Sequence, residues 1–192
     1  MLGSIPTSYL VGKAMKGIDL REHGSGNLGA TNAFRVLGWK TGLFVLACDT
    51  LKGALPVIFL PGAVLSRGCD LLSVPNLALV IGLATILGHI FTVFMKFKGG
   101  KGVAASMGVF IALAPVPFLI TLIVCLFIIG ITRYVSAGSL AGAIMLPALV
   151  IVFHSDRAPL CVFTAVVGIL IIIRHRSNIR RLLRGEENKL FP

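Results

Sequence analysis

The sequence predicts an all-α integral membrane protein. Three observations favour this fold class: a mean hydropathy of +0.96, 56% hydrophobic residues, and 13% charged residues in a chain of 192. Soluble domains carry about 25% charged residues. The apolar residues form long runs separated by short polar stretches. We therefore expect a single transmembrane domain over residues 1–192 and no separate soluble domain.

The apolar runs, taken in order, are candidate membrane helices. Met1–Gly12 is shorter than the roughly 20 residues that a crossing needs, and we expect this first helix to be truncated or tilted. It has no positively charged beginning, so it does not resemble a cleavable signal. Later runs predict full crossings, at Thr41–Leu65, Val74–Met95, Leu140–Phe153 and Ala158–Ile173.

The run Val103–Ile131 carries no charge and holds two prolines near its middle, which break a helix. As one crossing, it would place the basic Lys96–Lys101 loop and the basic tail on opposite sides of the membrane. As two short crossings, it places the basic loops on one side, which is the cytoplasmic side. The opposite side then keeps two basic residues, Arg67 and Arg157. This predicts about seven transmembrane helices, with the N-terminus outside and the C-terminus in the cytoplasm.

The charge and the metal-ligand residue types exclude some partners. A net charge of +11 would suggest nucleic acid for a soluble protein. Here basic loops that fix topology and meet anionic lipid explain it better, so we expect no nucleic-acid partner. The four cysteines and four histidines show no metal-ligand spacing, and we expect neither a metal nor a cofactor.

The polar stretch Gly24–Arg35, GSGNLGATNAFR, lies between apolar runs. Such a stretch is tolerated at membrane depth only where it is buried in protein or faces water. Its glycines allow close backbone approach, and its side chains offer hydrogen-bond donors beside Arg35. The alternative is a surface loop followed by a helix capped by Thr31 or Asn32. That alternative explains one or two polar residues, whereas the donors here are Ser25, Asn27, Thr31, Asn32 and Arg35.

A second polar run, Lys96–Gly102, precedes an apolar helix. Gly99 and Gly100 can present backbone N–H groups to an anion, Lys101 supplies charge, and the helix N-terminus adds its dipole. The run is not a Walker A motif. Taken alone, it fits better a membrane-interface loop with snorkelling lysines.

Further polar residues follow the last long apolar runs. Ser136 and Ser139 are either small helix-packing residues or hydroxyl donors to a substrate. His175 and Asn178 are three apart and would share a helix face, with Arg181 one turn further. A basic interfacial helix on anionic lipid is the better explanation for the other basic residues of the tail, Arg174, Arg176, Arg180 and Arg184.

Asp49 and Lys52 lie three residues apart inside the predicted crossing Thr41–Leu65. Ionisable residues at such a depth suggest a function. The alternative is that the two simply pair with each other.

Taken together, these runs resemble the bacterial acyl-phosphate:glycerol-3-phosphate acyltransferase family (PlsY). The matching segments occur in the family's order along the whole chain. They are GSIP (3–6), GSGNLGATNAFR (24–35), DTLKG (49–53), GH (88–89), KFKGGKGVA (96–104), RYVSAGS (133–139), and RHRSNIRRL (174–182) with Glu187. Family members usually have a longer apolar lead before GSIP, so we expect an incomplete first helix. They also usually have a proline at the position of Thr92.

The resemblance implies a seven-helix protein of the bacterial inner membrane with its active site facing the cytoplasm. It implies transfer of a fatty acyl group from acyl-phosphate to the 1-hydroxyl of glycerol 3-phosphate, the first acylation step of phospholipid synthesis. Membrane lipid is the remaining expected partner. The implied catalytic residues are Arg35, Lys101, Ser136 and His175. The implied substrate-binding residues are Ser25, Asn27, Thr31, Arg35, Gly99, Gly100, Lys101, Ser139 and Asn178.

Two other functions stay open at this point. A transporter of an organic phosphate anion would also place basic, glycine-rich segments within the membrane, although the chain shows no convincing internal repeat. The same acyl transfer could also use acyl-CoA or acyl carrier protein as donor. The sequence has no G-x-S-x-G nucleophile motif, which favours a direct transfer without an acyl-enzyme.

Overall fold

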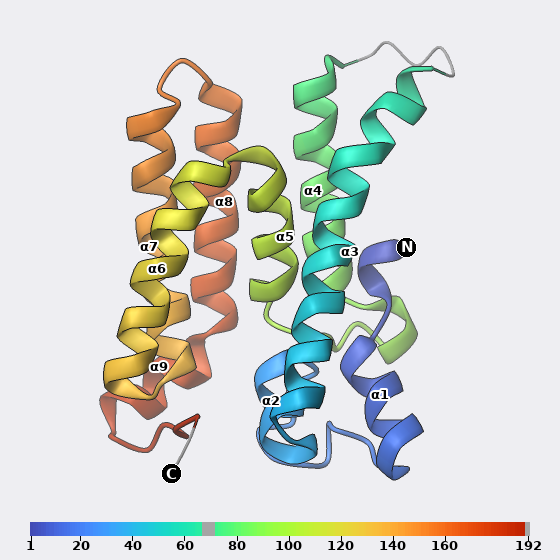
Figure 1. The fold of residues 1–192 in the computed structure, drawn as a ribbon, viewed down its shortest axis with the longest axis vertical. Coiled ribbons are helices and arrows are strands. Elements are labelled where there is room, and N and C mark those ends of the chain that lie inside the picture. Colours follow the sequence, from blue (N-terminus) through green and yellow to red (C-terminus); the bar gives the residue numbers. More distant parts are fainter. Residues whose placement is uncertain (67–71, 191–192) are drawn as a thin grey trace. The chain divides into compact units, whose positions relative to one another are not determined.

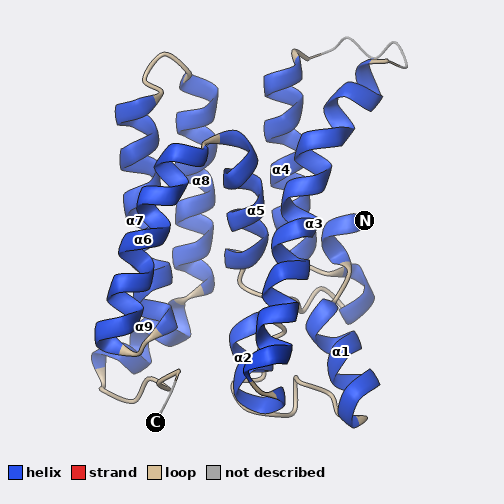
Figure 2. Cartoon of the chain, viewed as in Figure 1, coloured by secondary structure: helices blue, strands red, loops and turns tan. Residues whose placement is uncertain are grey.

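The computed structural model describes residues 1–66 and 72–190, in which helices are joined by loops and no strand occurs (Figure 2). Two residues of the sequence argument, Arg67 and Cys69, lie outside the described residues. The helices form two compact units, Met1–Leu113 and Ala114–Pro192. The expectation of one domain over the whole chain stays a prediction.

The first unit contains short and long helices (Figure 1). They are η1 (Leu2–Ser4), α1 (Thr7–Lys16), α2 (Ala30–Leu37), α3 (Trp39–Leu65), α4 (Val74–Ile90), η2 (Val93–Met95) and α5 (Val103–Leu113). The expected first helix within Met1–Gly12 is wrong in its bounds, because Pro6 separates a 3₁₀ turn from α1. Helix α1 then continues past the apolar run and ends at Lys16, and the next residue, Gly17, has a φ of 68°.

Helix α3 is the centre of the first unit, and α1, α2, α4 and α5 all pack against it. The contact with α5 is close because glycines lie on both helices. A Cβ on Gly53 would collide with the carbonyl oxygen of Ala105, and a Cβ on Gly108 would collide with that of Thr50. Small residues of this kind let membrane helices approach at backbone distance.

A buried apolar cluster lies beneath the first polar run. It consists of Leu20, Leu28, Ala33, Leu37, Val45 and Met95. Leu20 and Leu28 come from the loop itself, and the others come from α2, α3 and η2. Burying a leucine side chain stabilises by about 1.5–3 kcal/mol, so the loop before α2 is anchored at two points.

The second unit contains α6 (Pro115–Thr132), α7 (Val135–Phe153), α8 (Ala158–Arg174) and α9 (Arg176–Leu183). The expected helix break in Val103–Ile131 is confirmed: α5 ends at Leu113, and α6 begins with Pro115 after Ala114, whose φ of −149° is not helical. Helix α7 begins at Val135, earlier than the predicted Leu140, so the polar RYVSAGS run is mostly helical.

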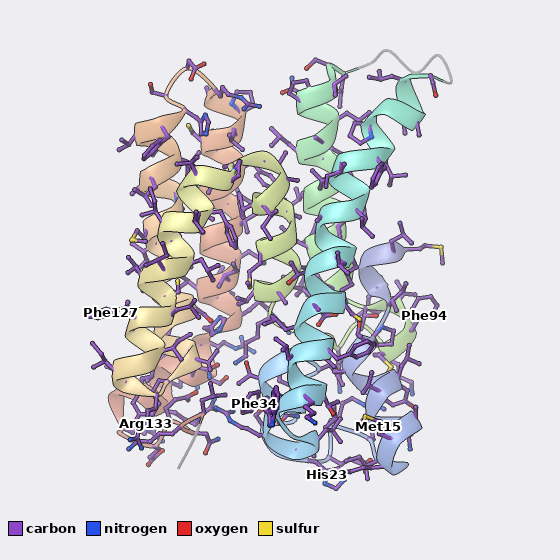
Figure 3. All side chains as sticks on the ribbon, in the orientation of Figure 1. Met15, His23, Phe34, Phe94, Phe127 and Arg133 are labelled. Carbon is purple, nitrogen blue, oxygen red and sulfur yellow. The ribbon has the colours of Figure 1, made fainter. Side chains whose placement is uncertain are left out.

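Within the described residues, four segments are long and apolar enough to cross a membrane: Trp39–Leu65, Val74–Met95, Pro115–Thr132 and Val135–Phe153. A fifth arises if α8 and α9, bent by 58°, form one span. Helix α5 has 11 residues and a length of about 16 Å, which is short for a crossing. Exposed apolar side chains on these helices fit a lipid environment. Phe127, 67% exposed, points away from α6 (Figure 3).

Candidate active site

The first polar run forms a loop that Asn32 holds together. Asn32 is 1% exposed. Its Oδ1 accepts a hydrogen bond from the Ser25 amide at 2.9 Å, and its Nδ2 donates to the carbonyl oxygens of Leu20 and His23, each at 3.0 Å. These bonds satisfy three backbone groups of the loop. Asn32 therefore shapes the loop from within and has little surface left for a ligand.

The alternative explanation of the first polar run, in which Thr31 or Asn32 caps the following helix, is wrong. Helix α2 begins at Ala30, and its N-cap is Gly29, which has no side chain to donate or accept. Asn32 already bonds backward to the loop, and Thr31 is in the first turn. Thr31 and Arg35 are four residues apart and share one face of α2. Both are half-buried, and the Arg35 Nε is below the surface.

The second polar run turns tightly against the end of α4. The Gly99 amide donates to the Ile90 carbonyl at 3.0 Å, and the Gly100 amide donates to the His89 carbonyl at 3.1 Å. A Cβ on either glycine would collide with His89. These glycines thus serve close packing, and their two amides are engaged within the protein instead of pointing outward as the sequence suggested.

Lys101 follows this packed turn directly. It is half-buried and stands two residues before the first residue of α5, Val103. Gly102, between them, has a φ of 92°, a conformation that favours glycine. The backbone on both sides of Lys101 is therefore fixed, which limits where its ammonium group can lie.

The structure brings the two polar runs together within the first unit. A Cβ on Gly100 would lie 3.0 Å from the carbonyl oxygen of Leu28, so the loop before α2 rests on the glycine turn. A cavity of about 10 Å³ lies at this junction, enough for about one water molecule. Its lining includes residues of α3, α4 and both runs: Ile5, Pro6, Thr7, Leu28, Lys52, His89, Thr92, Gly99 and Gly100.

In the second unit, three side chains converge on one buried carboxylate. Glu187 Oε1 accepts from Asn178 Nδ2 at 2.7 Å and from the Ser136 hydroxyl at 3.0 Å, and Oε2 accepts from Arg181 Nε at 2.8 Å. Glu187 is 8% exposed. The tail therefore folds back and ties the start of α7 to α9.

The pKa of Glu187 reflects this environment. Burial by itself would raise the pKa of the carboxyl, because it disfavours the charged form. The hydrogen bonds from Asn178, Arg181 and Ser136 outweigh burial, and the pKa is lowered below its ordinary value. Glu187 is thus a carboxylate at neutral pH, and a fixed negative charge stands behind Ser136 and Asn178.

His175 lies at the bend between α8 and α9 and is 3% exposed. Its Nδ1 is 2.8 Å from the carbonyl oxygen of Ile171. Since a carbonyl can only accept, Nδ1 carries the proton in the neutral ring and Nε2 is the basic nitrogen. His175 precedes the first residue of α9, so the expected shared helix face with Asn178 is replaced by a bend with both side chains buried.

Ser139 donates its hydroxyl hydrogen to the Val135 carbonyl one turn earlier, at 2.9 Å. This bond is common for a serine within a helix. The hydroxyl oxygen keeps its capacity to accept a hydrogen bond. Ser136, by contrast, donates to Glu187 and connects two segments of the chain.

Comparison with known proteins shows which family the chain belongs to. A family model described as glycerol-3-phosphate acyltransferase matches residues 1–185. The chain belongs to the glycerol-3-phosphate acyltransferase family. Curated relatives with this name include that of Chlorobaculum tepidum, 43% identical over 99% of this chain and 92% of its own length, and that of Trichlorobacter lovleyi, 44% identical over 98% and 92%.

Solved structures agree with the family. The chain is similar to a crystal structure of PlsY (YgiH), an integral membrane glycerol 3-phosphate acyltransferase, in its glycerol 3-phosphate form. The TM-score is 0.86, with 43% identity over 98% of this chain and 90% of that chain. The lysophosphatidic acid form of PlsY matches with a TM-score of 0.84 and 42% identity, over 98% and 89%.

The candidate residues of this glycerol-3-phosphate acyltransferase fall into two groups. The first unit holds Ser25, Asn27, Thr31, Arg35, Gly99, Gly100 and Lys101, and the second holds Ser136, Ser139, His175 and Asn178. Sequence reasoning gave no role to Glu187, which partners Ser136 and Asn178. Two signals in the sequence pointed toward it: Arg181 lies one turn after Asn178, and Glu187 is among the residues that match the family.

Proposed function

We propose that this acyltransferase moves a fatty acyl group from acyl-phosphate to the 1-hydroxyl of glycerol 3-phosphate, giving lysophosphatidic acid and phosphate. The observation that carries the proposal is the match over nearly the whole chain to PlsY, whose solved forms contain glycerol 3-phosphate and lysophosphatidic acid. These two ligands are the acyl acceptor and the acylated product of that reaction. A transport function has no comparable support.

The donor is the finer part of the proposal. Acyl-phosphate is a mixed anhydride whose phosphate leaves readily, so the acceptor hydroxyl can attack the carbonyl carbon directly. The C–O bond of the ester forms, the bond to the phosphate oxygen breaks, and phosphate departs. The absence of a G-x-S-x-G motif in the sequence agrees with a transfer that needs no acyl-enzyme.

Arg35 and Lys101 are proposed to bind the phosphates of the two substrates. The phosphate groups of the two substrates repel each other, and nearby cations lower the cost of bringing them within reacting distance. Arg35 presents a planar fork suited to phosphate oxygens, and Lys101 a compact charge. Ser25, Asn27 and Thr31 add donors from the same loop and helix face. Gly99 and Gly100 contribute by letting the turn pack closely.

Ser136, Ser139, His175 and Asn178 are proposed to serve the same reaction from the second unit. The proton of the acceptor hydroxyl passes either to His175 Nε2 or to a phosphate oxygen of a substrate. A general base contributes about 10²- to 10⁴-fold. His175→Gln should therefore lower kcat by that factor if the ring takes the proton, and leave kcat within a few-fold if the phosphate does.

The membrane topology is also a proposal: about seven crossings, the N-terminus outside, and the active site facing the cytoplasm of the bacterial inner membrane. It is supported by the way basic loops gather within each unit. The two polar runs meet at Leu28 and Gly100. In the second unit the Leu190 amide donates to the Arg133 carbonyl at 2.8 Å, so the tail lies against the α6–α7 loop.

The function is tested with purified protein in micelles, given acyl-phosphate and glycerol 3-phosphate. We expect lysophosphatidic acid and phosphate in equal amounts, and none from the Lys101→Ala variant prepared in parallel. Product formed without a second compartment excludes transport as the main activity. Replacing acyl-phosphate with acyl-CoA or acyl carrier protein should abolish product, and turnover with those donors alone would contradict the proposal.

A further inference from the structure

A buried ionic cluster lies beside the glycine turn and outside the residues assigned so far. Asp49 of α3 is 1% exposed. Its Oδ1 lies 2.6 Å from Lys52 Nζ and accepts from the Thr7 hydroxyl at 2.8 Å. Its Oδ2 lies 4.0 Å from Nδ1 of His89. The i,i+3 pairing of Asp49 with Lys52, one of two alternatives from sequence, is therefore confirmed.

The cluster connects three segments of the first unit. Lys52 Nζ also donates to the Ile5 carbonyl at 2.9 Å, so the segment before α1 is tied to α3. His89 brings in the last turns of α4. A charge pair buried in this way has fixed geometry, because moving either partner leaves the other unpaired and poorly solvated.

His89 joins this cluster to the turn that carries Lys101. Its carbonyl oxygen accepts from the Gly100 amide. Its ring nitrogen Nε2 lies so close to Gly100 that a Cβ there would collide with it. On the other side of Gly100 lies the Leu28 carbonyl. The two nitrogens of the His89 ring thus face different neighbours: Nδ1 faces Asp49 and Nε2 faces Gly100.

We propose that Asp49, Lys52 and His89 are positioning residues for acyl transfer: they fix the Gly99–Gly102 turn, and so the place of Lys101. This rests on the proposed phosphate-binding role of Lys101. None of the three needs to touch a substrate. Their effect reaches the reaction through the packing of His89 on the glycines, and a small displacement of a phosphate-binding group can cost about 100-fold in rate.

The test uses the full-length protein in micelles. Asp49→Asn keeps the shape of the side chain and removes its charge. His89→Gln removes the ring and leaves the Asp49–Lys52 pair intact. We expect each variant to lower kcat/KM about 10- to 100-fold and to change kcat and KM in the same proportions as Gly100→Ala, which disturbs the turn directly.

Hydrogen exchange gives a second readout that does not depend on activity. The amides of Gly99 and Gly100 donate to backbone carbonyls and should be protected in the wild type. We expect a peptide covering residues 97–104 to exchange at least about 10-fold faster in Asp49→Asn and His89→Gln. If this peptide exchanges at the wild-type rate in both variants, the proposal is overturned, even if their activity falls.

Two matched controls separate positioning from general effects. Thr164→Val changes a buried hydroxyl of α8, 1% exposed, and should lower the thermal midpoint while kcat/KM stays at the wild-type value. Asp156→Asn removes a charge from an exposed loop and should change neither. If Asp49→Asn does not fold, His89→Gln decides alone. Wild-type kinetics in His89→Gln would overturn the proposal.

Failure of the proposed function would look different. If the wild-type protein makes no lysophosphatidic acid, the acyl-transfer proposal fails, while the exchange experiment still decides whether the cluster fixes the turn. If the wild type is active and both variants equal it in kinetics and exchange, the function stands and the positioning role falls.

Discussion

Asn178 Nδ2 donates to Glu187 Oε1 at 2.7 Å, across the turn that follows α9. This bond holds a tail residue against α9, which carries the candidate site residue Asn178 near its start. The same carboxylate also accepts hydrogen bonds from the Ser136 hydroxyl and from Arg181 Nε. Because three donors share this one buried carboxylate, Glu187 joins the tail, α9 and the start of α7.

Glu187→Gln should lower stability, because the amide loses the charge that three donors stabilise. Hydrogen bonds to charged groups contribute more than neutral ones, and we expect a loss of about 2 kcal/mol at pH 7. The thermal midpoint in micelles, followed by loss of helix signal, measures it. Glu186→Gln, at the exposed neighbouring carboxylate, is the matched control and should leave the midpoint unchanged.

The stabilisation that Glu187 provides should also depend on pH, and the Glu187→Gln variant measures this. The folded-state pKa of Glu187 is lowered from its ordinary value of 4.5, so its stabilisation is present above that value and is lost as pH falls through the folded-state pKa. The difference in midpoint between wild type and Glu187→Gln should stay constant from pH 7 to about pH 5.5 and then shrink. A difference that grows on acidification contradicts the assigned direction.

Gly100→Ala should be damaging, because its Cβ would collide with the His89 ring and meet the Leu28 carbonyl at 3.0 Å. Overpacking of this kind costs about 1–3 kcal/mol, and we expect kcat/KM to fall at least about 10-fold through displacement of the turn. The measurements are the thermal midpoint and acyl-transfer kinetics. Gly62→Ala in α3, where an added Cβ would meet no atom within 4 Å outside its own stretch of helix, should leave both at wild-type values.

Asn32→Ala should loosen the loop before α2, since three backbone groups lose their partner. At about 1 kcal/mol for each bond, the loss is about 3 kcal/mol, and local opening becomes at least about 100-fold more frequent. Limited trypsin digestion in micelles should show faster cleavage after Arg21, which is exposed. Asn76→Ala, outside the loop, is the control, and equal cleavage of wild type and Asn32→Ala would contradict the role given to Asn32.

Local spacing predicted some of these features well. The prolines at 115 and 117 indicated the break between α5 and α6, because a proline at the start of a helix is tolerated while one in its interior removes a hydrogen bond. The three-residue spacing of Asp49 and Lys52 indicated their pairing. Apolar runs predicted the long helices α3, α4, α6 and α7 to within a few residues.

Other features depend on packing that no local pattern records. The start of α2 is set by Gly29, and Asn32 bonds back to the loop because Leu20 and Leu28 are buried beneath it. The approach of His89 to Asp49 requires α4 to pack on α3. Glu187 follows α9 in a segment without periodicity, so its three partners could not be assigned from the sequence.

The number of membrane crossings is a further feature that local sequence patterns do not determine. Charge asymmetry predicts about seven, whereas in the part of the chain that the structure describes, length and hydropathy identify four, or five with the bent α8–α9 pair. Helices α1 and α5 are too short to be identified by length, at 10 and 11 residues. Their assignment as crossings needs a measurement of loop accessibility from each side of the membrane.

The central claim is that Arg35 and Lys101 bind the phosphates of acyl transfer, and one measurement tests it most directly. This is the turnover of acyl-phosphate and glycerol 3-phosphate by purified Arg35→Ala and Lys101→Ala, each with its thermal midpoint in micelles. Removing a cation that binds phosphate should abolish turnover while the midpoint stays close to that of the wild type. Near-normal turnover by either folded variant would contradict the claim.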